Sequence, residues 1–295
     1  MNSEARHEGD YADRQVEAAR RVLVDVGQVL ASFRDAIVVV GGWVPDLLFP
    51  GDEPKHVGSM DVDLALDAAK LGDGRYAELL KLLLDTGRYE KVDKDFQLVS
   101  TVDLRDGEVP LRVEVEFLAP ADVRLKKNHP KRIEGFRVLQ FPACSAAFGH
   151  PVNIELEGLM ISGGRNTVRL RVASLPDFII MKAHALAGRD KTKDVYDLCY
   201  CLDESPDAIA VVAGDWGSHR EDPLVGAAID SLREKFATVD HYGPKQLAIF
   251  HDSTDDDERA MHARRALELI QKLLSACSLI SPTHTPRSNS RAACD

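Results

Sequence analysis

The sequence predicts an α+β fold: a mixed β-sheet flanked by helices, followed by an all-helical C-terminal part. Over the first part of the chain, short apolar runs that are β-branched or alternate with polar residues recur, which is typical of strands. After Ser174 the apolar residues recur at helical spacing instead. We therefore expect a first domain at residues 1–173, a helical domain at 174–280, and a small, polar, disordered tail at 281–295.

Local patterns predict each element of the first part. Apolar residues at helical spacing predict a helix at residues 10–34, and the β-branched run "AIVVV" after it predicts a buried strand. Gly41 and Gly42 end that strand, and "WVPDLLF" predicts a short helix with Pro45 in its first turn. The other expected elements are a strand at 60–67, a helix at 75–86, and strands at 89–92, 96–104, 109–120, 152–156 and 167–172.

The second part contains helical patterns only. The segment "SLPDFIIMKAHALAGRDKTKDVYDLCYCLDES" predicts two helices separated at Gly188, with Ser174 as the N-cap of the first. Further helices are expected at 222–237, 243–250 and 256–277.

The composition indicates a soluble globular protein. The 295 residues are 44% hydrophobic and 29% charged, with a mean hydropathy of -0.20, which is enough apolar material for a core. No apolar run reaches the roughly 18 residues that a membrane span requires, and the N-terminus is too polar for a signal peptide, so we expect a cytoplasmic protein. The five cysteines lack metal-ligand spacing, which indicates free thiols in a reducing compartment.

Two aspartates lie one residue apart in the predicted strand "MDVDLALD". On a strand, Asp61 and Asp63 share one face, about 6–7 Å apart. Like charges this close favour a bound cation, and carboxylate oxygens are the ligands of hard divalent ions. In "LRVEVEFL", Glu114 and Glu116 also share a face, so a neighbouring position for this strand would give a ligand set for two Mg²⁺ ions.

The glycine pair before these aspartates suggests a phosphate site. Between a strand and a helix, Gly41 and Gly42 allow backbone N–H groups to approach phosphate, with the helix N-terminus assisting. Each of these short motifs is weak alone, but their order is that of a phosphate turn followed by a metal strand.

Together the motifs resemble the DNA polymerase beta-like nucleotidyltransferase superfamily. Its signature is a glycine pair, then an Asp-x-Asp strand with apolar alternate residues, then an acid on a later strand, and the match covers residues 36–118. The resemblance implies a nucleotidyltransferase core in which Gly41 and Gly42 bind phosphate. It also implies that Asp61 and Asp63 bind metal, with two Mg²⁺ ions expected and Mn²⁺ as an alternative.

The third acid and the residue after the glycine pair are the two positions at which the match to the family pattern is incomplete. The third acid is expected at Glu116, because "VEFLAP" is similar to the "VDFLTP" type of segment in these proteins, and Glu114 remains open. Many members have Ser or Thr after the first glycines, whereas this chain has Trp43, so a hydroxyl contact to the triphosphate is missing there.

Lys182 lies in the middle of the apolar arc of its predicted helix. A buried ammonium group requires an anion, and the next helix offers Asp194 and Asp197 on its flank, one turn apart. Two interpretations remain open and are compatible. One is a structural ion pair between packed helices, and the other places Lys182 on the triphosphate of a nucleotide, held or gated by Asp194.

The segment "LPDFIIMKAHALAGRDKTKDVYDL" resembles the K…A…R…KD-x-x-DL segment of AbiEii-like nucleotidyltransferases, the toxins of type IV toxin–antitoxin and abortive-infection systems. With it, the resemblance extends over residues 36–202. It implies that Lys182 and Asp194 are needed for activity, that the helical domain completes the site, and that a cognate antitoxin exists. The nucleotide-binding candidates are Gly41, Gly42, Trp43, Lys182, Arg189 and Lys193.

Two alternatives compete with the toxin interpretation. "GGWVPDLL" also resembles the opening of small antibiotic nucleotidyltransferases, in which Asp46 would match an aspartate of the motif, but those enzymes lack the KD-x-x-DL helix. The second alternative is an inactive member that binds a nucleotide or a partner protein, and Trp43 is the feature that favours it.

The expected reaction moves a nucleoside monophosphate from a nucleoside triphosphate to an acceptor hydroxyl and releases pyrophosphate. The toxin resemblance implies RNA, at a tRNA 3′ end, as acceptor. The net charge of -11 argues against a surface that binds nucleic acid throughout, so RNA would need a local basic patch. Its candidates are Arg124, Lys126, Lys127, Lys131, Arg132, Arg165, Arg169, Arg171, Arg189, Lys191 and Lys193.

Overall fold

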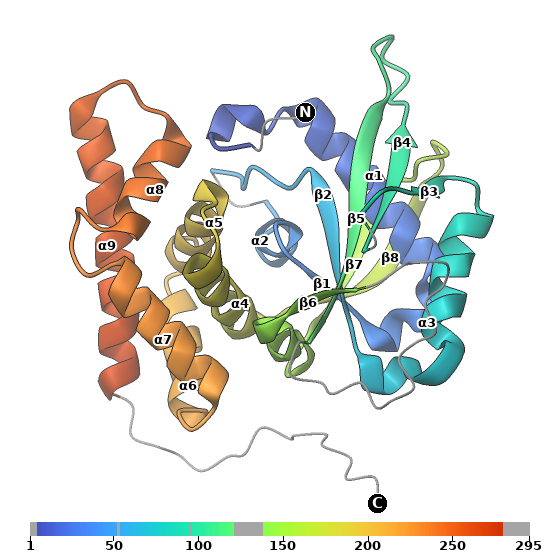
Figure 1. Ribbon diagram of the computed structural model, residues 1–295. Coiled ribbons are helices and arrows are strands. Elements are labelled where there is room, and N and C mark those ends of the chain that lie inside the picture. Colours follow the sequence, from blue (N-terminus) through green and yellow to red (C-terminus); the bar gives the residue numbers. More distant parts are fainter. Residues whose placement is uncertain (1–4, 52–53, 95, 121–137, 280–295) are drawn as a thin grey trace, which may run out of the picture. The chain divides into compact units, whose positions relative to one another are not determined.

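The structure is a computed structural model that describes residues 5–51, 54–94, 96–120 and 138–279 (Figure 1). The chain divides into two compact units, of which one is Gly9–Ser174 and the other comprises Met1–Glu8 and Leu175–Asp295. The basic segment at 124–137 and the predicted tail at 281–295 lie outside the described residues. Within them, no helix combines the length and the apolar content needed to cross a membrane.

A mixed β-sheet forms the centre of the Gly9–Ser174 unit, as the predicted α+β class requires, and that class is confirmed. Within the described part of the chain, eight strands pair in the order β3-β4-β5-β2-β1-β8-β7, and β6 pairs with β5. Strand β2 runs parallel to β5 and antiparallel to β1, and β1 is parallel to β8. The strands are β1 (Ile37–Val40), β2 (Asp61–Leu66), β3 (Tyr89–Lys91), β4 (Gln97–Val102), β5 (Leu111–Pro120), β6 (Leu139–Phe141), β7 (Val152–Leu159) and β8 (Arg165–Val172).

The α-helices in the described residues of the same unit are α1 (Asp13–Val29), α2 (Trp43–Leu48) and α3 (Ala68–Asp85). The first is shorter than predicted, because a 3-10 helix at Ala31–Ala36 follows it. The third begins at Ala68 rather than at residue 75, because the Asp67 carboxylate accepts hydrogen bonds from the first free backbone N–H groups and caps the helix. Strand β6 and the 3-10 helix at Pro142–Phe148 were not predicted.

Helix α1 covers one face of the sheet. Its side chains Leu23 and Val26 line the same cavity as Val39 and Leu64, so those strand residues face α1. Side chains alternate along a strand, so Asp61 and Asp63 point to the opposite face from Leu64. Burial of apolar side chains beneath α1 therefore fixes the register that presents the two aspartates together.

The second unit is helical in all its described regular elements. Its helices are α4 (Leu175–Gly188), α5 (Thr192–Asp203), α6 (Ala208–Ser218), α7 (Pro223–Lys235), α8 (Tyr242–His251) and α9 (Asp256–Leu279). Helix α6 was not predicted, whereas the others lie where the sequence placed them. Large buried side chains such as Phe178, Trp216, Phe236 and Phe250 form the core. The four described cysteines, at positions 144, 199, 201 and 277, are buried.

Candidate functional site

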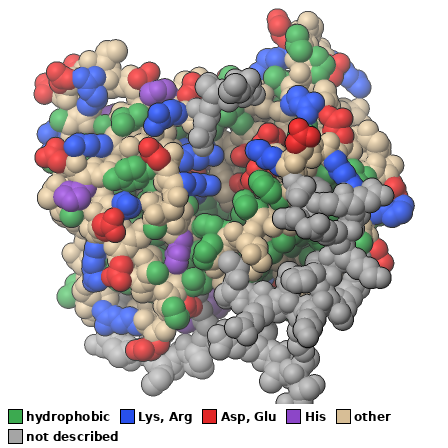
Figure 2. Space-filling model, in the orientation of Figure 1, with side chains coloured by type: hydrophobic (Ala, Val, Ile, Leu, Met, Phe, Trp, Pro, Cys, Tyr) green, Lys and Arg blue, Asp and Glu red, His purple; other side chains and the backbone are tan. Residues whose placement is uncertain are grey.

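Four carboxylates share one face of the two central strands β2 and β5. The parallel register pairs Asp61 with Glu114 and Asp63 with Glu116. Paired residues on neighbouring strands project to the same face, so the predicted neighbouring position of the two strands is present. Figure 2 shows acidic side chains gathered over the part of this unit where β2 and β5 lie in Figure 1.

The Gly41 turn lies directly against Asp63. The antiparallel ladder pairs Val40 with Asp63, and the next residue, Gly41, has a positive φ of 69°. A Cβ atom at position 41 would lie 1.9 Å from Oδ2 of Asp63. Position 41 therefore requires glycine for two reasons, its left-handed backbone and the contact with the carboxylate. Gly42 has an ordinary helical φ of -70°, so the conformational demand falls on Gly41 alone.

Asp61 is held by two hydrogen bonds. The Ser59 hydroxyl lies 2.5 Å from Oδ1 of Asp61 and donates to it. The indole Nε1–H of Trp43 donates to the backbone carbonyl of Asp61 over 2.7 Å, and Trp43 is only 1% exposed. The single N–H of the indole is thus used inside the protein, so we expect no hydrogen bond from the Trp43 side chain to a phosphate.

The two glutamates of β5 lie in different surroundings. Glu116 is half-buried and accepts a long hydrogen bond of 3.4 Å from the amide of Gln97, which is buried on β4. Glu114 is exposed, and its Oε2 lies 3.9 Å from the ammonium of Lys94. The half-buried position beside Asp63 favours Glu116 over Glu114 as the third acid of the site.

The donor set of this face fits a hard divalent cation. Asp61, Asp63 and Glu116 supply carboxylate oxygens from adjacent strands in register, which are the ligands that Mg²⁺ prefers. As placed, the side chains of the described residues form no group of three or more His, Cys, Asp or Glu that could hold a metal ion. The fit thus rests on the register and the chemistry of the donors, not on a formed coordination sphere.

Asp46, the residue singled out by the antibiotic-enzyme alternative, has a structural partner. It lies in the first turn of α2, and its Oδ2 accepts a hydrogen bond of 2.9 Å from Arg20 of α1. This pair ties α2 to α1, which is the role that the contact supports.

In the helical unit, Lys182 forms the centre of a buried charge network. Its Nζ donates to Asp194 and to Asp197, both over 2.7 Å, so the two alternative pairs are present together. Lys193 donates to Asp197 over 2.6 Å, and Arg189 binds both oxygens of Asp194 over 2.7 and 2.8 Å. Both aspartates are fully buried, as is almost all of α5.

Three cations contact two carboxylates in this network: Lys182 lies between Asp194 and Asp197, Arg189 pairs with Asp194, and Lys193 pairs with Asp197. Burial alone would lower the pKa of Lys182, but the charges of Asp194 and Asp197 outweigh it and raise that pKa above its ordinary value. Burial would likewise raise the pKa of Asp194, yet Lys182 and Arg189 lower it to about 2. The Arg189 side chain is 54% exposed, so it is the member of the network that can reach a ligand from solvent.

Most of the described members of the predicted basic patches form contacts within the chain, some of them on its surface. Arg169 and Arg165 pair with Glu155 and Glu157 on the neighbouring strand, over 2.9 and 3.1 Å. Arg171 donates to the Asp35 backbone carbonyl. Arg189 and Lys193 belong to the buried network, and Lys193 is only 3% exposed. The first predicted group, at Arg124, Lys126, Lys127, Lys131 and Arg132, lies outside the described residues.

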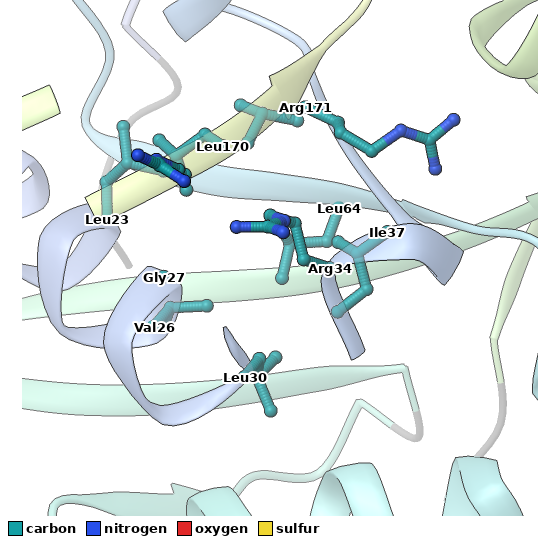
Figure 3. Close-up of a pocket in the computed structure, with 11 residues that line it drawn as sticks. Leu23, Val26, Gly27, Leu30, Arg34, Ile37, Leu64, Leu170 and Arg171 are labelled. Atoms are coloured by element: carbon teal, nitrogen blue, oxygen red, sulfur yellow. The ribbon is translucent and has the colours of Figure 1, made fainter. Parts of the chain in front are cut away.

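A small cavity, partly open to solvent, lies on the other face of the sheet (Figure 3). Apolar side chains of α1, β1, β2 and β8 form its walls, and Arg34, Arg169 and Arg171 are its charged members. Figure 3 shows the Arg171 guanidinium pointing away from the other lining residues. Because Leu64 lines this cavity and faces away from Asp63, the cavity is separate from the carboxylate face.

Comparison with known proteins gives one family. A family model described as nucleotidyl transferase AbiEii toxin, type IV TA system, matches residues 28–276. Among solved structures, JHP933 from Helicobacter pylori is 14% identical over 90% of this chain and 94% of its own, with a TM-score of 0.42. MenT4, a nucleotidyltransferase toxin from Mycobacterium tuberculosis, is 14% identical over 93% of this chain and 99% of its own, with a TM-score of 0.44. A comparison with curated proteins gives no match.

Proposed function

The chain belongs to the AbiEii family of nucleotidyltransferase toxins, and from this premise we propose a metal-dependent transfer of a nucleoside monophosphate to an acceptor hydroxyl. The observation that carries the proposal is the register of β1, β2 and β5. It places Asp63 opposite Val40, beside the Gly41 turn, and in line with Glu116. A phosphate turn and a set of carboxylates thus lie side by side.

We assign the metal to Asp61, Asp63 and Glu116. When bound there, Mg²⁺ or Mn²⁺, with two ions expected, would neutralise charge on the triphosphate and make the acceptor hydroxyl more acidic. The three carboxylates would hold the ion through their oxygens. The Gly41–Gly42 turn lies against Asp63, and its backbone N–H groups are suited to phosphate oxygens.

The proposed reaction forms one bond at the α-phosphorus of the nucleotide and breaks another. The acceptor oxygen forms a bond to the α-phosphorus of the nucleoside triphosphate, and the bond between the α-phosphorus and its bridging oxygen to the β-phosphorus breaks. Pyrophosphate leaves, and the proton of the acceptor hydroxyl passes to Glu116, the third acid in this proposal. Transfer of this kind is catalysed mainly by positioning and charge stabilisation.

We propose that the Lys182 network supplies counter-charge for the triphosphate. The Arg189 guanidinium, which pairs with the buried Asp194 and is itself 54% exposed, supports this role. A phosphate oxygen can compete with Asp194 for Arg189, because both are acceptors of the same bidentate kind. The structural and catalytic interpretations of Lys182 thus hold together: the aspartates keep the ammonium charged and fixed, and the network attracts the polyphosphate.

An RNA acceptor, a tRNA 3′ end in particular, is the acceptor that we propose. This acceptor is what the sequence resemblance to AbiEii-like toxins implies. The family description as a toxin of a type IV toxin–antitoxin system implies a cognate antitoxin as partner. The alternative is a small-molecule acceptor such as an antibiotic, and the structural pairing of Asp46 with Arg20 counts against that relationship.

The experiment incubates purified protein with Mg²⁺, each of the four α-labelled nucleoside triphosphates in turn, and either total tRNA or an aminoglycoside mixture. Label in the tRNA band supports the proposal and identifies the nucleotide. Label on the aminoglycosides alone supports the antibiotic enzyme. Mg²⁺-dependent nucleotide binding without transfer to either acceptor supports an inactive binding member. Induced expression gives a second distinction, since a toxin arrests growth and a resistance enzyme does not.

A further inference from the structure

We propose that Trp43 is a positioning residue for the metal site: its indole N–H fixes the backbone of Asp61 and so aims the Asp61 carboxylate. This inference rests on the proposed function, because it takes Asp61 as a metal ligand. Trp43 stands where many family members have Ser or Thr after the glycine pair. In this inference its side chain acts on Asp61 and does not contact the nucleotide.

The pairing of β2 shows why Asp61 needs this contact. Strand β1 pairs with β2 only from Asp63 to Leu66, because β1 ends at Val40 and the chain then turns away at Gly41. The first two residues of β2 therefore have no partner on β1. The hydrogen bond of 2.7 Å from Trp43 reaches the carbonyl of Asp61 at this point, so the indole takes the place of a missing strand neighbour.

The position of Trp43 makes this contact rigid. It is the first residue of α2, directly after the glycine pair, and its side chain is 1% exposed. A buried aromatic ring has few accessible rotamers, and a buried indole N–H must be paired. The carbonyl of Asp61 is thereby fixed to the same turn that lies against Asp63.

A second contact fixes the other end of the residue. The Ser59 hydroxyl lies 2.5 Å from Oδ1 of Asp61, so the carbonyl and the carboxylate of Asp61 are held from two directions. Groups that orient a metal ligand without touching the metal typically change metal affinity by about 10-fold to 100-fold when removed. Trp43 acts on the backbone of the ligand, so we expect the lower end, about 10-fold.

The test compares Trp43→Phe with Trp216→Phe, which together cover both tryptophans of the chain. Trp216 is an ideal control because it is also fully buried and its indole also donates to a backbone carbonyl, that of Pro176, over 3.3 Å. It belongs to the other compact unit. Both variants lose ring size and one indole donor, so both should lose stability, but only Trp43→Phe should weaken metal binding.

Mn²⁺ affinity is measured by the electron paramagnetic resonance signal of the free ion, with Asp63→Ala to identify the site. The expected result is a Kd for Mn²⁺ raised about 10-fold in Trp43→Phe and unchanged in Trp216→Phe. Transfer by Trp43→Phe should recover at high Mg²⁺ concentration, because the chemistry of the carboxylates is intact. A purely structural role would lower activity at every Mg²⁺ concentration alike.

Equal Mn²⁺ affinity in wild type and Trp43→Phe overturns the inference while leaving the proposed function intact. If the wild type binds Mn²⁺ no more tightly than Asp63→Ala does, both the inference about Trp43 and the proposed function are overturned. Should Trp43→Phe fail to fold, benzothienylalanine at position 43 replaces only the N–H by sulfur and keeps the ring volume. In that protein too, a raised Kd supports the inference and an unchanged Kd overturns it.

Discussion

Substitution of Gly41 by alanine tests the contact between the glycine turn and the Asp63 carboxylate. The new Cβ atom would lie 1.9 Å from Oδ2 of Asp63, whereas ordinary contact begins at 3.4 Å. The carboxylate must therefore move by about 1.5 Å, the difference between these two distances. A displacement of about 1 Å in a reacting group can lower the rate roughly 100-fold, and we expect at least that loss of nucleotide transfer in Gly41→Ala.

A second contribution comes from the backbone, and Gly87 separates it from the first. Gly87 has a φ of 70°, against 69° for Gly41, and a Cβ atom there would meet nothing within 4 Å. Alanine in this left-handed conformation costs about 1–2 kcal/mol. Both variants should lose that amount of unfolding free energy in urea denaturation, but Gly87→Ala should keep full activity.

The assay is label transfer at saturating Mg²⁺, with Mn²⁺ affinity and urea unfolding measured on the same preparations. Gly41→Ala should be impaired in transfer and in Mn²⁺ binding, because Asp63 has moved. If Gly41→Ala and Gly87→Ala have equal transfer rates and equal Mn²⁺ affinities, the carboxylate does not depend on the glycine and the reasoning is refuted.

Three further predictions concern charges. Lys182→Met should lower the unfolding free energy in urea by about 3–5 kcal/mol, because the buried Asp194 and Asp197 both lose the ammonium group that donates to them; a loss under 1 kcal/mol would contradict the buried network. The pKa of Asp194 is lowered to about 2 from an ordinary 3.8, so its stabilisation is complete above about pH 4 and disappears as the pH falls toward 2. Between pH 4 and pH 2, the unfolding free energy of the wild type should fall by about 2 kcal/mol more than that of Asp194→Asn. Urea unfolding of both proteins at each pH measures this difference. Glu116→Gln should abolish transfer whereas Glu114→Gln should retain most of it, and the opposite order would reassign the third acid.

The alternating strands could be predicted because burial on one face determines them. In "MDVDLALD" and "LRVEVEFL" every second residue is apolar, so the shared face of Asp61 and Asp63, and that of Glu114 and Glu116, followed from the period of a strand. The pairing of the two strands was an expectation that no local pattern could establish. It depends on the order of strands in the whole sheet.

Helix α6 was missed because its sequence gives no clear helical face. "AIAVVAGDWGS" is apolar in almost every position and contains two glycines, so neither its period nor its propensity indicated a helix. Tertiary burial of residues such as Val212 and Trp216 compensates for this weakness. The start of α3 was missed for a smaller reason, the capping carboxylate of Asp67.

The partners within the site were less accessible to sequence reasoning than its residues. Asp194 and Asp197 are three positions apart on α5, so both can reach one ammonium, and the sequence could only offer them as alternatives. The contact of Trp43 with Asp61 joins residues 18 positions apart through a carbonyl. Backbone acceptors carry no side-chain signature, so no motif could have indicated it.

The central claim is that the carboxylates of β2 and β5 perform a metal-dependent nucleotide transfer. The most direct measurement is Mg²⁺-dependent transfer of label from α-labelled nucleoside triphosphates to tRNA by wild type, Asp63→Asn and Asp46→Asn. Asp46 is the matched control, since it is an aspartate of the same motif region that pairs with Arg20. We predict that Asp63→Asn abolishes transfer while it remains folded, and that Asp46→Asn retains it. Transfer by folded Asp63→Asn at the wild-type rate would contradict the account.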